Sequence, residues 1–143
     1  MNLKPARQAQ YEQYAEFTFT MADAMLDVNG VLLGFKTASG VFEPIPLPNG
    51  AIVTNGDITV ETVSNDSGTA TIAVGDSVSA ARYLAATSIK AAARTPLVPT
   101  GYRGNGENIR ITFANAGANA TLGTVSIRVA YIIANRMHEV VIV

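Results

Sequence analysis

Two short segments of alternating polar and apolar residues constrain this chain more than any other feature. Residues 57–62 (DITVET) and residues 69–74 (TATIAV) each alternate with a period of two, and the turn-forming sequence Asn-Asp-Ser-Gly lies between them. A period of two is typical of strands with one buried face. The sequence therefore predicts an antiparallel hairpin within residues 50–76. Because a lone hairpin is marginal in water, further strands are required.

Several other segments supply those strands. Strand-like alternation or β-branched composition occurs at residues 14–21, 31–36, 51–53, 108–114 and 124–133, with turn signals about every ten residues. This spacing is typical of an all-β antiparallel sandwich or jelly roll, here of about eight strands. Residues 77–93 are alanine-rich and follow Asp76, a plausible N-cap, so one short helical segment is predicted there.

The domain organisation follows from the same patterns. Residues 1–13 are polar and predict an N-terminal arm, either disordered or ordered on a neighbouring subunit. Residues 14–143 predict a single jelly-roll domain that ends in a C-terminal strand at 136–143. Residues 38–50, with prolines at 44, 46 and 48, predict an extended edge or a loop, and residues 101–108 predict a glycine-rich loop.

Composition narrows the range of partners. Only 15% of residues are charged against 48% hydrophobic, which favours a surface that is partly covered by another protein. The net charge is −1 and lysine and arginine do not cluster, which argues against nucleic acid or an anionic membrane as partner. No apolar run approaches the roughly 18 residues of a membrane span. The first ten residues lack an apolar signal core, so synthesis in a cytoplasm is expected.

Catalytic chemistry has few candidates in this chain. There is no cysteine, and His138 is the single histidine. Because His138 alternates with Val140 and Ile142, a structural or interface role suits it better than a catalytic one. Asp57 and Glu61 share a strand face about 13 Å apart, too far to share a proton, so a solvated face is the preferred interpretation. No enzymatic activity, cofactor or metal is expected.

Five sequence segments carry a resemblance to a known family. They are residues 17–20 (FTFT), 47–53 (LPNGAIV), 71–76 (TIAVGD), 82–84 (RYL) and 123–132 (GTVSIRVAYI). Because these segments follow one another in this order, the chain resembles, over residues 17–133, the small jelly-roll capsid decoration (cement) proteins of tailed bacteriophages. Residues 1–16 and the segment from Ala134 lie outside the resemblance.

The resemblance implies a structural virion protein without enzymatic activity. Such a protein binds the outer surface of the assembled head, bridges neighbouring subunits of the major capsid protein and stabilises the capsid as a homo-oligomer. A dimer is favoured over a trimer, because a two-fold partner can share an edge strand. The alternative is a phage tail, fibre or receptor-binding β-sandwich module. A cupin-like enzyme is disfavoured by the single histidine.

Contact residues are expected at the chain ends and in the loops, where tyrosine and arginine commonly anchor interfaces. The predicted capsid contacts are Lys4, Arg7, Tyr11, Tyr14, Phe42, Pro44, Pro46, Tyr102 and Arg103. The predicted subunit-pairing residues lie in the apolar C-terminal strand and are His138, Val140 and Ile142.

Overall fold

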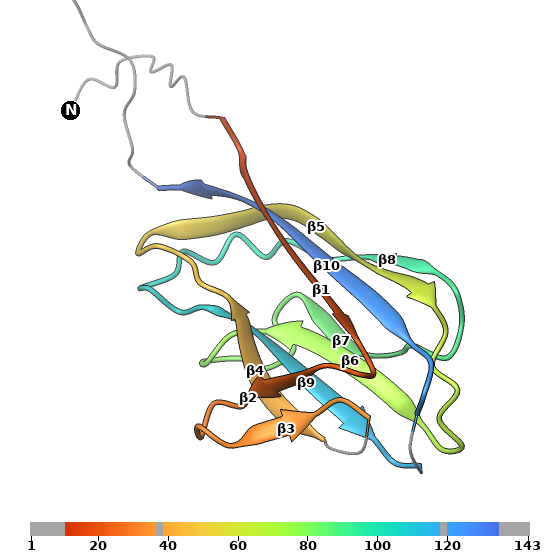
Figure 1. Ribbon diagram of the computed structural model, residues 1–143. Coiled ribbons are helices and arrows are strands. Elements are labelled where there is room, and N and C mark those ends of the chain that lie inside the picture. Colours follow the sequence, from red (N-terminus) through yellow and green to blue (C-terminus); the bar gives the residue numbers. More distant parts are fainter. Residues whose placement is uncertain (1–10, 37–38, 118–119, 135–143) are drawn as a thin grey trace, which may run out of the picture.

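The computed structural model describes residues 11–36, 39–117 and 120–134, which form ten strands and no helix. The strands are β1 (Gln13–Thr20), β2 (Ala24–Leu26), β3 (Leu32–Gly34), β4 (Gly40–Ile45), β5 (Ala51–Thr62), β6 (Ala70–Gly75), β7 (Leu84–Ser88), β8 (Arg94–Pro96), β9 (Ile109–Asn115) and β10 (Thr124–Ile133). They build two antiparallel four-stranded sheets that face each other, plus a small hairpin (Figure 1).

The strand order is that of a jelly roll with one inserted hairpin. One sheet has the order β1-β10-β5-β8, the other has the order β4-β9-β6-β7, and β2 pairs only with β3. When the β2–β3 hairpin is set aside, eight strands remain. Successive strands then alternate between the sheets, apart from β6 and β7, which form a hairpin. This is the double-sheet arrangement of two Greek keys, and it confirms the predicted fold class.

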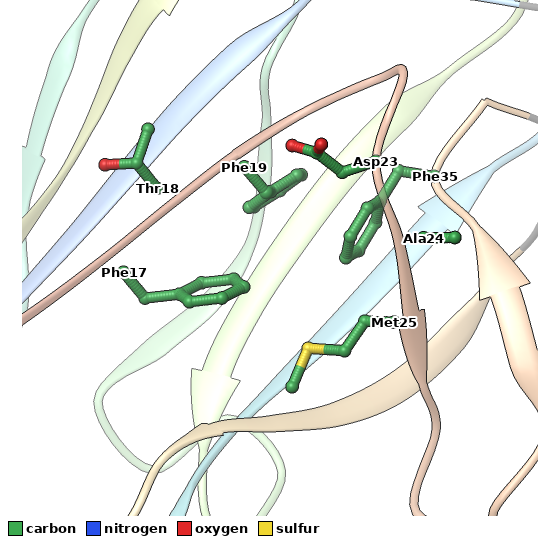
Figure 2. A pocket seen from close by; sticks show the side chains of 7 residues that line it. All are labelled: Phe17, Thr18, Phe19, Asp23, Ala24, Met25 and Phe35. Carbon is green, nitrogen blue, oxygen red and sulfur yellow. The ribbon is translucent and has the colours of Figure 1, made fainter.

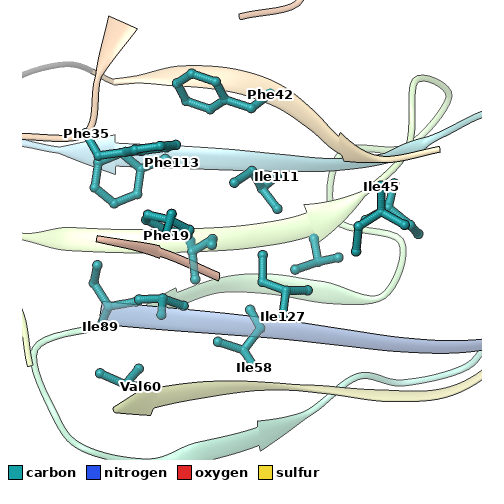
Figure 3. Packing of buried hydrophobic residues seen from close by; sticks show 14 of the residues in the cluster. Phe19, Phe35, Phe42, Ile45, Ile58, Val60, Ile89, Ile111, Phe113 and Ile127 are labelled. Carbon is teal, nitrogen blue, oxygen red and sulfur yellow. The ribbon is translucent and has the colours of Figure 1, made fainter. Parts of the chain in front are cut away.

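The core lies between the two sheets and is richest in aromatic rings at one end. The rings of Phe19 and Phe35 stack with centroids 4.3 Å apart, and Phe113 meets Phe35 edge to face at 5.5 Å. Isoleucines and valines from both sheets, among them Ile111 and Ile127, extend the cluster (Figure 3). The inward positions of β1 and β9 are those that the period-two pattern predicts, because successive side chains of a strand point to opposite faces.

The predicted hairpin at residues 57–62 and 69–74 is wrong. Both segments are strands, but β5 pairs with β10 and β8, whereas β6 pairs with β9 and β7 in the opposite sheet. The segment between them crosses from one sheet to the other. Asn65 fixes this crossing, since its side-chain oxygen accepts hydrogen bonds from the backbone N–H groups of Thr121 and Leu122. The turn residues therefore predicted that the chain reverses its direction, but not which strands β5 and β6 pair with.

The predicted helical segment at residues 77–93 is also wrong. Asp76 does accept N–H bonds from Val78 and Ser79, as an N-cap does, yet a short turn follows and the chain enters β7. The backbone N–H of Tyr83 bonds to the carbonyl of Val74, and both Tyr83 and Ile89 are buried. Tertiary burial of these two side chains overrides the helix propensity of the alanines.

The remaining predicted segments differ from the structure in their bounds or lie outside the described residues. Residues 31–36 contribute only the short β3, whose partner β2 contains Met25 and Leu26. The proline-containing segment 38–50 provides β4, an edge strand with an irregular register between Phe42 and Ile45. The predicted arm at 1–13 lies outside the described residues up to residue 10, and β1 already begins at Gln13. The predicted C-terminal strand at 136–143 lies wholly outside them.

Candidate interaction surfaces

One end of the sandwich gathers several of the predicted contact segments. The backbone N–H of Gly50 bonds to the carbonyl of Gly104 at 2.8 Å, and the N–H of Ala134 bonds to the carbonyl of Gly50 at 2.8 Å. Gln13 lies opposite Tyr131 in the β1–β10 pair. These links bring together residues 11–13, 46–50, 101–106 and 134, which we call the loop end. It lies at the upper left of Figure 1, where β1 begins and β10 ends.

The glycine-rich loop at residues 101–106 is held by a chain of polar contacts. The guanidinium carbon of Arg82 lies 3.5 Å from the centre of the Tyr102 ring, and Arg82 Nε donates to Asp76 at 2.5 Å. The Tyr102 hydroxyl donates to Glu107 at 3.1 Å, and Glu107 also accepts the N–H of Asn105 at 2.5 Å. The loop is thereby fixed to the turn between β6 and β7.

The electrostatics of this chain of contacts favour charged Asp76. Burial alone raises the pKa of its carboxyl group, but the hydrogen bond from Arg82 and the N–H groups of Ser79 and Val78 outweigh burial and hold the pKa below its ordinary value. Burial raises the pKa of the neighbouring Tyr83 to about 12. The site therefore contains a charged pair and, beside it, a neutral phenol near pH 7.

The predicted capsid-contact residues differ widely in exposure. Those with exposed side chains are Tyr11, Tyr14, Pro46 and Arg103, and the half-buried ones are Pro44 and Tyr102. Tyr102 is bound within its own chain, whereas Arg103 has no side-chain partner among residues 11–36, 39–117 and 120–134. The remaining predicted residues, Lys4, Arg7, His138, Val140 and Ile142, lie outside the described part of the chain.

Phe42 was predicted as a capsid contact, but its side chain is buried in the core. Its side chain is 0% exposed, and its ring lies 4.8 Å from the ring of Phe35 between the sheets. The sequence predicts an extended edge or a loop over residues 38–50, and the structure has the edge strand β4 at residues 40–45, in which Phe42 points inward. Phe42 therefore packs in the core and is not presented to a partner.

The β2–β3 hairpin carries an apolar surface that the sequence analysis did not single out. Leu26 and Leu32 face each other across the hairpin and are 58% and 67% exposed, and Val28 and Val31 beside the turn are also exposed. We call these four side chains the hairpin patch. The turn is firm, because Asp27 Oδ1 accepts the N–H groups of Asn29 and Val31. The available signal was the apolar residues on both sides of the turn, where polar residues are usual.

A row of alternating charges crosses the outer face of the β1-β10-β5-β8 sheet. Arg128 lies between Glu16 at 3.3 Å and Asp57 at 3.4 Å, and Asp57 also accepts a bond from Arg94 at 2.8 Å. The row contains two positive and two negative groups and is therefore neutral overall. The Asp57 side chain is 14% exposed and pairs with two arginines rather than with Glu61, so this carboxylate is part of an ion-pair network rather than freely solvated. Such a face offers specific polar contacts but no field that attracts a polyanion.

The described ranges contain neither a cluster of metal-ligating side chains nor a membrane-spanning helix. No group of three or more histidine, cysteine, aspartate or glutamate side chains there is placed to hold a metal ion. No helix in those ranges is long and apolar enough to cross a membrane.

Comparison with known proteins gives matches at the level of structure only. No family model matches the chain, and no curated protein sequence matches it. A chain from the cyanophage Pam1 capsid asymmetric unit is similar over 93% of this chain and 93% of its own length, with 21% identity and a TM-score of 0.64. This fold is shared with phage capsid structures.

Two further phage capsids support the same conclusion. A chain in the acidic stable capsid structure of Helicobacter pylori bacteriophage KHP30 covers 85% of this chain and 92% of its own length, with 18% identity and a TM-score of 0.54. The match to a chain in the capsid of Ralstonia phage GP4 covers 94% of this chain and 93% of that chain, with 15% identity and a TM-score of 0.56. The matches extend over nearly the whole of each chain, so they concern the complete jelly roll rather than one motif.

Proposed function

We propose that this protein is a structural component of a phage virion that binds the outer surface of the assembled head. There it bridges neighbouring subunits of the major capsid protein and stabilises the shell, in the manner of a cement protein. The observation that carries the proposal is the near end-to-end similarity to chains in three phage capsid structures. The family resemblance of the sequence points in the same direction.

The surface chemistry of the chain supports a role in protein binding without catalysis. The hairpin patch exposes four large apolar side chains on a firmly bonded turn. Exposed apolar groups gathered in one place commonly mark a surface that a partner covers. Most polar groups of the loop end are paired within the chain, and the charges on the outer face of the β1-β10-β5-β8 sheet are paired among themselves, as in a rigid binding module. We therefore propose no enzymatic activity and no cofactor.

Two surfaces are proposed to contact the coat protein. The first is the loop end, where Tyr11, Pro46 and Arg103 are exposed, with Tyr14 nearby on β1. The second is the hairpin patch beside β4, joined to that strand by a bond from Val28 N–H to the Val41 carbonyl. A protein with two separate contact surfaces can touch two coat subunits at once, which is what bridging requires. Many copies, each of which binds weakly, then act together on one shell.

Binding of the purified protein to undecorated phage heads tests this proposal. The protein is mixed with such heads and with free coat subunits, and each mixture is sedimented. Saturable binding to heads at a fixed ratio to coat subunits, with little binding to free subunits, is expected. No binding to heads, with a stable trimer in solution, would favour the alternative of a tail, fibre or receptor-binding module.

A further inference from the structure

One edge of the sandwich presents unpaired backbone groups. Within the described ranges, β1 has β10 on one side and no strand on the other. The N–H of Met21 bonds to the carbonyl of Gly123, in register with the β1–β10 pair. In an antiparallel pair every second residue bonds to the neighbouring strand, so the residues between them direct N–H and C=O away from it. On β1 those residues are Tyr14, Glu16, Thr18 and Thr20.

The turn after β1 satisfies only the last of these residues. Asp23 Oδ2 accepts the N–H of Thr20 at 2.7 Å, and the N–H of Asp23 bonds to the Thr20 carbonyl at 3.1 Å. Among the described residues, the outward groups of Tyr14, Glu16 and Thr18 have no partner strand and form a row along the edge. Such a row is a template for another strand unless proline or lysine blunts it. The sequence of β1, QYAEFTFT, contains neither.

An apolar groove runs beside this edge. It has a volume of about 390 Å³ and is lined by Phe17, Thr18, Phe19, Asp23, Ala24, Met25 and Phe35. Figure 2 shows β1 and β2 diverging from their common turn, with the side chains of Phe17 and Met25 between them. Both side chains are only partly buried and pack against the core. A strand added along β1 would place alternate side chains against Phe17 and Met25 and close this side of the sandwich.

We propose that this edge and groove receive residues 139–143 (EVVIV) of a second copy of this chain. The segment is apolar and β-branched after Glu139 and contains no proline, so it is suited to strand addition. In an extended conformation Val140 and Ile142 share one face, which can lie in the groove. The proposal goes beyond the proposed function: it concerns the homo-oligomer that the family resemblance predicts, and it does not depend on capsid binding.

The geometry of β10 argues against the chain's own segment as the occupant. Ala134 follows the end of β10 and lies at the start of β1, as the pairing of Gln13 with Tyr131 shows. Every strand pair in this sheet is antiparallel, and a guest antiparallel to β1 continues that pattern. Such a guest runs parallel to β10, so a connection within one chain needs a crossover of about a dozen residues, whereas only residues 135–138 separate Ala134 from Glu139. A second copy is not subject to this limit, and a guest parallel to β1, which the chain's own end could form after a short turn, would give a monomeric wild type in the test below.

A pair of variants at Glu16 tests the edge with the full-length chain. Glu16→Pro removes one outward N–H and leaves the bonds to β10, while Glu16→Ala keeps the N–H and equally loses the contact with Arg128. Light scattering is expected to give an oligomer for wild type and Glu16→Ala. Glu16→Pro is expected to weaken association at least about fivefold and shift the mass toward the 15.0 kDa monomer. A monomeric wild type, or equal association of both variants, would overturn the proposal.

A second variant keeps the test valid if Glu16→Pro does not fold. Deletion of residues 139–143 leaves every described residue in place and is expected to yield the monomer. Hydrogen exchange of the full-length protein should show protected amides at Tyr14, Glu16 and Thr18, and the deletion should remove this protection. Protection that persists in the deletion variant would show another occupant and overturn the proposal. Head binding by the monomeric variants, measured separately, reports on the proposed function alone.

Discussion

The guanidinium group of Arg82 lies over the ring of Tyr102, 3.5 Å from its centre, and the same group binds Asp76. Arg82 belongs to the turn before β7, and Tyr102 belongs to the loop before β9. The contact therefore joins two loops that are twenty residues apart in the sequence. It helps to fix the glycine-rich loop as part of the loop end, where Arg103 also forms a backbone bridge with Ile52.

Replacement of Tyr102 tests this contact. Tyr102→Ala removes both the cation–π contact and the bond to Glu107, whereas Tyr102→Phe removes only that bond. We expect Tyr102→Ala to lower the free energy of unfolding by about 1–2 kcal/mol and Tyr102→Phe by less than about 1 kcal/mol, as measured by urea denaturation. Equal losses in the two variants would show that the ring contact contributes nothing.

The Asp76–Arg82 pair predicts a pH dependence of stability. The pKa of Asp76 is lowered on folding, because hydrogen bonds from Arg82 and from two backbone N–H groups outweigh burial. Its contribution to stability is then complete above the unfolded pKa of about 3.8 and is lost as the pH falls through the lower folded pKa.

We expect Asp76→Asn to be less stable than wild type by about 1.5–3 kcal/mol at pH 7, the usual value for a hydrogen bond to a charged group. The difference should shrink as the pH falls below about 3.8, because wild type then loses the charge as well. Urea denaturation of both proteins from pH 7 to pH 2.5 measures this. A difference that stays constant over that range would contradict the assigned role of the Asp76 charge.

Phe35 is expected to be the side chain that ties the β2–β3 hairpin to the core. It follows β3, is 1% exposed and contacts the rings of Phe19, Phe42 and Phe113. Phe35→Ala should lower the free energy of unfolding by about 3–5 kcal/mol, since it leaves a cavity among rings that cannot collapse fully. Leu32→Ala, at an exposed position of the same hairpin, is the control and should cost less than about 0.5 kcal/mol in urea denaturation.

The hairpin patch gives a prediction for head binding. Substitution of Leu26 and Leu32 by serine should leave the melting temperature nearly unchanged, because both side chains are more than half exposed. If the patch contacts the coat protein, the apparent affinity for undecorated heads should fall at least about tenfold in co-sedimentation. Val78→Ser, at a residue that is 65% exposed on the turn before β7, is the matched control. Unchanged binding of the double variant would remove the patch from the proposed contact surface.

Local sequence patterns were enough to predict the fold class and most strands. The alternation in residues 14–21, 108–114 and 124–133 corresponds to β1, β9 and β10, and it identifies inward residues such as Phe19 and Ile127. This works because a strand directs successive side chains to opposite faces whatever its neighbours are. Four of the residues predicted to make contacts, Tyr11, Tyr14, Pro46 and Arg103, have exposed side chains.

Only the tertiary structure decided which strands pair and which loops meet. The sequence between β5 and β6 signals a turn, but a turn can close a hairpin or cross between sheets, and the choice depends on β10 and β9, which come more than thirty residues later. Burial of Tyr83 and Ile89 likewise overrode the helix propensity of residues 77–93, and the inward side of β4 placed Phe42 in the core. Pairing and burial are long-range properties, so period and propensity determined the strands while packing between distant segments determined the jelly roll and its surfaces.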